Sequence, residues 1–308
     1  MFNWKKQGLI FVANHHSDWM QSHAMIPTPH KISEERLRIY LTFCDGQGIG
    51  RVGFVEVDAA NPSRVLRISD KPVLDIGLPG TFDENGVLQT SIVSLPDGRK
   101  FLYYVGFELG AQIRYRLLTG LAISEDGGLT FQRVKRTPIL ERSDSEMFFR
   151  CGPLVVFDDG RFKMWYVAGS EWQEIDGKPM PVYVIKYIES ADGIHWPDEG
   201  RVCIPIQHEN EHGFGRPYVI RENDLWRMFY SIRVKHLGYR LGYAESTDNI
   251  KWVRKDDEMG LGVSDSGWDS QTICYSAVIS VQNETYMFYN GNEFGKSGFG
   301  YAILVSNL

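Results

Sequence analysis

Four copies of one strand pattern recur along the chain at a nearly constant distance. Each copy is a short apolar strand that ends in an aromatic pair, and the last residues of the four pairs are Tyr104, Tyr166, Tyr230 and Tyr289. These tyrosines are separated by roughly 60 residues, a period typical of architectures built from one repeated supersecondary unit. A chain with this pattern must therefore stack its repeats around a shared core.

Each aromatic pair is followed by a second strand of Gly-Tyr-Ala type, and three copies continue into a Ser-x-Asp-Gly or Ser-x-Asp-Asn turn that reaches an aromatic residue. Asp-Gly and Asp-Asn tolerate the positive φ of tight hairpin turns, so the aromatic residue starts a further strand. Four antiparallel strands per repeat make a propeller blade.

A more diverged copy lies upstream, with middle strands at 37–41 and 53–57, and the last copy stops after its third strand at 304–305. The unassigned apolar strand at 9–12 can supply the missing fourth strand, which removes the free edge. The sequence therefore predicts an all-β, five-bladed β-propeller with four antiparallel strands per blade, in which the N-terminal strand closes the last blade. We expect one domain that covers residues 1–308.

Composition narrows the function classes. The net charge of −6 argues against a nucleic-acid partner, because phosphate binding needs concentrated positive charge. The four cysteines are widely spaced, which suits reduced core residues better than disulfides or a zinc site. No stretch approaches membrane-spanning length and no cofactor-binding motif is present. We expect a cytoplasmic protein without membrane contact, metal or cofactor, and the sequence leaves its oligomeric state open.

The candidate site residues lie where the innermost strand of each blade begins, because those strands line the central funnel of a propeller. Counting back 13 residues from the repeat tyrosines locates these positions. The segments found in this way, which hold ionisable and aromatic residues that the strands lack, are 15–27, 80–91, 150–153, 213–217 and 268–276.

Several motifs resemble a known group of proteins. They are the Gly-x-Phe-Asp-x-x-Gly-Val element at 80–87, the Met-Trp-Tyr and Met-Phe-Tyr strands, the Ser-x-Asp-Gly-Ile-x-Trp turn at 190–196 and the Phe-Tyr-Asn-Gly-Asn segment at 288–292. Together they resemble the five-bladed carbohydrate-active superfamily that includes glycoside hydrolase families 43, 32, 68 and 130. The resemblance covers the chain from about residue 20 to its end, and implies an enzyme of polysaccharide metabolism.

The acid pair of families 43, 32 and 68 cannot be carried over residue by residue. The first blade has no acid before Pro27 or Pro29, and the third begins Arg-Cys-Gly-Pro at 150–153. Asp83 and Glu84 remain, in the motif that does match, and Asp83 is the expected base or nucleophile. A glycosidase needs a second carboxyl group, for which the candidates are Asp18, Glu146, Glu211 and Asp269, with Glu146 and Asp269 favoured.

The candidate binding residues point to an anionic ligand. Arg150 and Arg216 begin inner strands, and guanidinium groups match carboxylates and phosphates with two parallel hydrogen bonds; the alternative is that they pair with Asp83 or Glu146 and hold the blades in register. The other predicted binding residues are His23, Glu84, Tyr275, Asn290 and Asn292.

These observations favour a carbohydrate-active enzyme that cleaves or transfers a glycosidic bond in the funnel, on an anionic or phosphorylated sugar. A phosphorylase, or a glycosyl transferase that uses a nucleotide sugar, would also explain the arginines. A non-catalytic sugar-binding propeller remains an alternative, and a protein-interaction scaffold fits least well. The expected ligand is a saccharide or a sugar phosphate.

Overall fold

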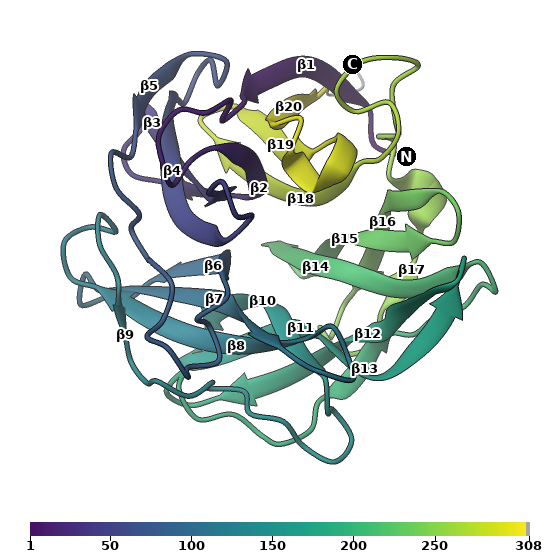
Figure 1. Ribbon diagram of the computed structural model, residues 1–308. Helices are drawn as coiled ribbons and strands as arrows, with labels where there is room; N and C mark the ends of the chain where they lie inside the picture. Colours follow the sequence, from purple (N-terminus) through teal and green to yellow (C-terminus); the bar gives the residue numbers. More distant parts are fainter. Residues whose placement is uncertain (306–308) are drawn as a thin grey trace.

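The computed structural model describes residues 1–305 and consists almost entirely of β-strands. Within this range there is no α-helix, and only two 3-10 turns interrupt the strands, η1 (Asp256–Glu258) and η2 (Asn292–Gly295). The predicted all-β class is confirmed. Figure 1 shows the curled sheets arranged as a propeller-like ring. None of the described residues forms a helix long and apolar enough to cross a membrane.

The strands pair antiparallel in units of four that follow the chain. The first unit contains β2 (Ser22–Lys31), β3 (Arg36–Cys44), β4 (Gly50–Asp58) and β5 (Val65–Ile68). The second contains β6 (Val87–Ser94), β7 (Lys100–Leu109), β8 (Tyr115–Ser124) and β9 (Gln132–Arg133). The third contains β10 (Phe149–Asp158), β11 (Arg161–Ile175), β12 (Lys178–Ser190) and β13 (Arg201–Ile204).

The fourth unit contains β14 (Glu211–Glu222), β15 (Leu225–Val234), β16 (Gly238–Ser246) and β17 (Val253–Arg254). The fifth combines β18 (Cys274–Val281), β19 (Glu284–Asn290) and β20 (Phe299–Leu304) with β1 (Trp4–Phe11) from the start of the chain. Trp4 lies opposite Leu304 and Phe11 opposite Phe299. The predicted docking of an N-terminal strand against the last repeat is therefore confirmed, although the strand spans Trp4–Phe11 instead of the expected 9–12.

The first strands of the units form the inner ring. β2 contacts β6, β6 contacts β10, β10 contacts β14, β14 contacts β18, and β18 returns to β2. All five carry a β-bulge or another irregularity in their pairing with the second strand of the unit. Bulges bend a strand and re-aim its side chains, and they are frequent next to functional sites.

The aromatic pairs of the sequence pack between neighbouring units. Successive side chains on a strand point to opposite faces, so Tyr103 packs towards the third unit whereas Tyr104 packs towards the first. Trp165 and Tyr166 divide in the same way between the fourth and second units. The second strand of each unit is thus buried on both faces, which explains its continuous apolar run.

The glycine that opens the Gly-Tyr-Ala strand makes room for the repeat tyrosine. A Cβ on Gly120 would lie 2.3 Å from Cζ of Tyr104, and one on Gly242 would lie 2.4 Å from Cε2 of Tyr230. Because real Cβ atoms do not approach other atoms so closely, a side chain here would displace the ring. The glycine of each of these repeats therefore leaves the space that the ring of the repeat tyrosine fills.

Candidate functional site

A cavity of about 320 Å³ opens at the centre of the ring and receives residues from all the strand units. Its walls are largely aromatic, and the six rings that line it are Phe107, Tyr115, Tyr183, Tyr239, Tyr275 and Phe294. Aromatic faces of this kind offer a flat apolar surface to a ligand, and tyrosine adds a polar tip. We call this cavity the central pocket.

Arg233 supplies the positive charge of the central pocket. Its guanidinium donates a hydrogen bond to the hydroxyl of Tyr183, and it lies 5.3 Å from the ring centre of Tyr183 and 5.7 Å from that of Tyr239. No carboxylate among residues 1–305 forms an ion pair with it, and no Asp or Glu of this range lines the pocket. The guanidinium is therefore held by aromatic rings and left without an acidic partner.

The tyrosines around Arg233 are neutral hydrogen-bond donors. Burial raises the pKa of Tyr183, Tyr239 and Tyr275 above the usual value. Since Tyr183 accepts a hydrogen bond from Arg233, its own O–H remains free to donate. The central pocket thus offers mainly donors to a ligand, a character that suits an anion.

Two residues predicted from the sequence, His23 and Tyr275, do line the central pocket. Both have a positive φ, of 61° for His23 and 56° for Tyr275, which is uncommon outside glycine. Both belong to inner strands with irregular pairing, and the N–H of Tyr275 donates to Oγ of Ser231 at 2.8 Å. Backbone strain of this kind concentrates at ligand sites, so the arrangement is consistent with a binding role.

Arg216 lies at the axis of the ring, where the residue is 3% exposed. It donates to the carbonyls of Pro27 and Thr90 at 3.0 and 3.1 Å, and to Oγ1 of Thr28 at 3.0 Å. A longer bond of 3.4 Å reaches the carbonyl of Tyr275. Burial lowers the pKa of Arg216 to about 10. Arg216 thus ties β2, β6, β14 and β18 together, and its predicted contact with a ligand stays a prediction.

The three predicted catalytic acids lie in three separate clusters, and none lines the central pocket. In each cluster the repeat tyrosine donates to the buried carboxylate, which also pairs with a cation. Asp83 accepts from Tyr104 at 3.0 Å and pairs with Arg133 at 2.6 Å. Asp269 accepts from Tyr289 at 3.1 Å and pairs with Lys6 at 2.7 Å.

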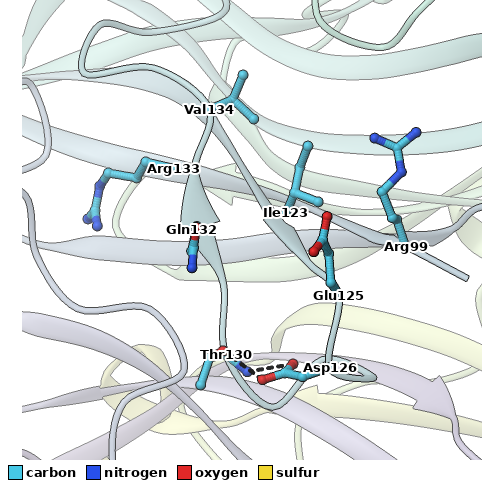
Figure 2. Close-up of a pocket in the computed structure, with 8 residues that line it drawn as sticks. All are labelled: Arg99, Ile123, Glu125, Asp126, Thr130, Gln132, Arg133 and Val134. Carbon is cyan, nitrogen blue, oxygen red and sulfur yellow. Dashed lines mark hydrogen bonds between the residues drawn. The ribbon is translucent and has the colours of Figure 1, made fainter.

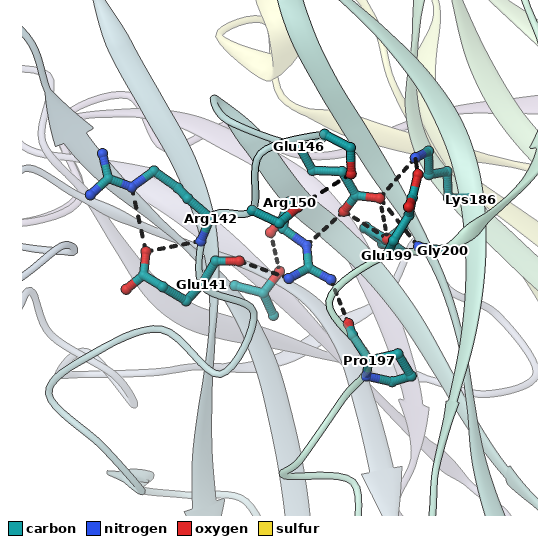
Figure 3. Close-up of polar contacts among 12 residues, drawn as sticks. Glu141, Arg142, Glu146, Arg150, Lys186, Pro197, Glu199 and Gly200 are labelled. Carbon is teal, nitrogen blue, oxygen red and sulfur yellow. Dashed lines mark hydrogen bonds and ion pairs between the residues drawn. The ribbon is translucent and has the colours of Figure 1, made fainter.

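Glu146 forms the third cluster, shown in Figure 3. Its carboxylate accepts from Tyr166 at 2.8 Å and pairs with Arg150 at 2.6 Å and with Lys186 at 2.9 Å. It also borders a separate opening of about 280 Å³ beside Tyr183. The alternative reading of Arg150, as an ion-pair partner of Glu146, agrees with this geometry.

The fourth unit contains the same arrangement with a different acid. Tyr230 donates to Asp256 at 2.6 Å, and Arg254 pairs with both Asp256 and Glu211 at 2.6 Å. Because a cluster of repeat tyrosine, carboxylate and cation recurs in four of the five strand units, the geometry favours a structural role. The catalytic role of Asp83, Glu146 and Asp269 stays a prediction without a shared site to support it.

The remaining predicted binding residues bond to the backbone around them. Glu84 accepts from the N–H of Gly80 at 2.7 Å, and Asn290 accepts from the N–H of Ile26 at 2.7 Å. Asn292 accepts from the N–H of Gln271 at 2.8 Å. These bonds shape the loops, and the predicted ligand contacts of the three residues stay predictions.

A recess of about 230 Å³ adjoins the central pocket, with which it shares Arg233, Tyr239 and Phe294. His212 lines the recess, and burial, aided by the charge of Arg233, lowers its pKa to about 4. At the rim, Nδ1 of His236 lies 3.0 Å from Oδ2 of Asp176, on the turns of the β15–β16 and β11–β12 hairpins. The recess therefore combines a neutral imidazole, a guanidinium and an imidazole–carboxylate pair.

The sequence reasoning did not find Arg233, Tyr239 or Phe107, because it considered only the starts of the inner strands. A signal for them exists in the repeat. Phe107 and Arg233 each follow a repeat tyrosine by three residues, and Tyr239 pairs with Arg233 across the β15–β16 hairpin. The ends of the second and third strands therefore complete the pocket.

A larger cavity of about 530 Å³ lies away from the centre, over β8 and β9, and Figure 2 shows its lining. It borders the two-residue strand β9, which pairs with Ala122 and Ile123 of β8. Asp126 at its base accepts backbone and hydroxyl hydrogen bonds of its own turn.

Comparison with solved structures defines the class of fold. A structure described as a glycoside hydrolase superposes with a TM-score of 0.76 and 18% identity, covering 98% of this chain and 92% of the other. A thermostable family-43 glycoside hydrolase gives 0.68 and 18%, covering 92% and 88%. A structure from the GH130 family of mannoside phosphorylases gives 0.71 and 14%, covering 98% and 94%. The chain has the propeller-like fold of glycoside hydrolases.

The sequence itself has a near relative. It is 36% identical over 301 residues to the uncharacterized protein Rv1502 of Mycobacterium tuberculosis, covering 98% of this chain and 99% of the relative. The chain therefore belongs to the Rv1502 family. No protein-family model matches it.

Proposed function

We propose that this protein is a carbohydrate-active enzyme that cleaves or transfers a glycosidic bond at the central pocket, on a saccharide with an anionic group. In this proposal residues 1–308 form one domain, and the five strand units are its five blades. The observation that carries it is Arg233, a guanidinium that has no acidic partner among residues 1–305 and lies inside an aromatic pocket of a glycoside-hydrolase fold.

The binding step follows from the lining of the pocket. The aromatic rings pack against the sugar, and the O–H of Tyr183 and the guanidinium of Arg233 donate to its anionic group. Arg216 lies at the axis, hydrogen-bonded to carbonyl and hydroxyl oxygens of the protein and outside the lining of the pocket. Arg233 therefore supplies the charge that favours an anion, because charge-assisted hydrogen bonds are about twice as strong as neutral ones.

Glycosidic bond cleavage also needs a group that protonates the leaving oxygen. We assign this role to His236. Asp176 holds its Nδ1, which leaves Nε2 to carry the transferred proton, and the pair borders the recess into which the leaving group would extend. The attacking group would be water in a hydrolase, phosphate in a phosphorylase or an acceptor sugar in a transferase.

The test is a product screen by mass spectrometry with neutral and anionic oligosaccharides, with and without inorganic phosphate, and with nucleotide sugars plus acceptors. We expect cleavage or transfer of an anionic saccharide, and a loss of at least about a hundredfold in turnover for His236→Asn. The control is Arg64→Met, a change at an exposed arginine paired with Asp58. Full activity of His236→Asn would remove His236 from the mechanism.

A non-catalytic sugar-binding protein is the second candidate. It is favoured by one observation, that no Asp or Glu among residues 1–305 lines the central pocket, although most glycosidases act with two carboxyl groups. Saccharide binding by the wild-type protein without any product in the screen would establish this alternative and end the enzyme proposal.

A further inference from the structure

We infer that the anionic group recognised at the central pocket is the carboxylate of a uronic acid residue at the end of a saccharide chain. This inference rests on the proposed function, because it names the substrate class of the same pocket. It separates acidic sugars from sugar phosphates and nucleotide sugars, all of which a guanidinium can bind.

The first argument is the charge at the site of contact. Among residues 1–305, Arg233 is the one lysine or arginine side chain that lines the central pocket. Burial, together with the charge of Lys296, lowers the pKa of His23, so this second basic group favours its neutral form. One guanidinium balances the single charge of a carboxylate, whereas a phosphate monoester carries about −1.5 to −2 at pH 7.

The second argument is the shape of the donor group. The guanidinium is flanked by the rings of Tyr183 and Tyr239, and its single side-chain partner in the described range is the Tyr183 hydroxyl. The planar fork of arginine matches a planar carboxylate with two parallel hydrogen bonds. The flanking rings restrict the fork to a narrow orientation, a geometry better suited to a flat acceptor than to a tetrahedral one.

The third argument is the depth of the pocket. Its volume of about 320 Å³ lies at the low end of small-molecule sites. Arg216 bridges β2, β6, β14 and β18 at the axis, so side chain and backbone close the base of the ring. The recess beside Arg233 gives the next sugar a place to lie. This arrangement accommodates a chain end rather than an internal segment.

The experiment measures affinity by titration calorimetry, with ligand-observed NMR for weak ligands. The probes are the methyl glycosides of glucuronic and galacturonic acid, their neutral hexose counterparts, glucose 1-phosphate and UDP-glucose. We expect at least one uronate to bind about tenfold to a hundredfold more tightly than its neutral counterpart, the range of a charge-assisted hydrogen bond. Arg233→Met should abolish this preference and Arg233→Lys should retain part of it.

The control is again Arg64→Met, which removes the same charge at an exposed position, and each variant is checked for folding by its thermal transition. Tighter binding of the sugar phosphate or nucleotide sugar, or equal binding of neutral sugars, overturns the uronate inference and leaves the proposed function standing. An unchanged uronate preference in a folded Arg233→Met overturns it as well. If no saccharide binds and none is processed in the product screen, the proposed function itself fails.

Discussion

Replacing Asp83 separates the two roles that this residue can have. Its carboxylate is fully buried, accepts from Tyr104 at 3.0 Å and from Thr81 at 2.9 Å, and pairs with Arg133 at 2.6 Å. In Asp83→Asn the shape is kept, but the charge opposite Arg133 is lost. Removing one partner of a buried ion pair costs about 3–5 kcal/mol. We expect the lower end, because the Arg133 side chain is 22% exposed and regains some hydration.

This loss of unfolding free energy converts into a shift of the melting temperature. An unfolding entropy of about 2.1 cal/mol/K per residue gives about 0.65 kcal/mol/K for a chain of this length, so the loss of 3–5 kcal/mol lowers Tm by about 5–8 °C. Differential scanning calorimetry measures this shift. Affinity for a central-pocket ligand should stay unchanged at temperatures where the variant is folded.

A double-mutant cycle sharpens the test. Arg133→Met in the Asp83→Asn background removes the uncompensated cation, so the double variant should be more stable than the sum of the single losses predicts. A folded Asp83→Asn with an unchanged Tm and without turnover would refute this reasoning and return Asp83 to the catalytic role that its motif suggested.

Three further predictions concern the ring. Deleting residues 1–11 should expose the edge of β20 and promote aggregation, measured by light scattering; a monodisperse truncated protein of unchanged Tm would contradict this. Gly120→Ala should lower Tm by several degrees, because the new Cβ meets Tyr104, whereas Gly46→Ala, at a turn glycine without a positive φ and with open space around it, measures the backbone effect alone. Burial lowers the pKa of His212 and His30 to about 4, so the unfolded state binds more protons between pH 6.5 and 4. The unfolding free energy should therefore decrease as the pH is lowered from 6.5 to 4, by at most about 1.4 kcal/mol per pH unit for each histidine. His212→Asn should reduce this slope, and an unchanged slope would exclude His212.

Fold and site differ in how much the sequence reveals. The aromatic pair and the glycine that faces it are local, and each reports a packing relation that the repeat imposes, so strands and N-terminal closure could be read from spacing alone. To predict the site residues, one must also know which side of each strand unit faces the pocket. Asp83 and Glu146 stand close to inner strands in the sequence, yet the chain turns their carboxylates towards Tyr104 and Tyr166.

Arg233 presents the opposite case, because it lies far from the start of an inner strand in the sequence and yet lines the pocket. It stands within an apolar strand, where one arginine attracts little notice, and it reaches the pocket because the β15–β16 hairpin extends beyond Tyr230. The bulges that give His23 and Tyr275 their backbone conformation have no signature in residue type. The direction of a side chain at a bulge depends on how the strand pairs with its neighbour, and this register cannot be predicted from the order of the residues alone.

The pairing of β1 with β20 also determines when the fold can close during synthesis of the chain. Trp4 leaves the ribosome early, but its partner Leu304 is added 300 residues later. At about 5–20 residues per second, the first strand spends about 15–60 s without its neighbour. Its edge is open to other chains throughout that interval. Nascent chains on the same messenger are thus natural competitors for β20, and conditions that slow translation would lengthen the competition.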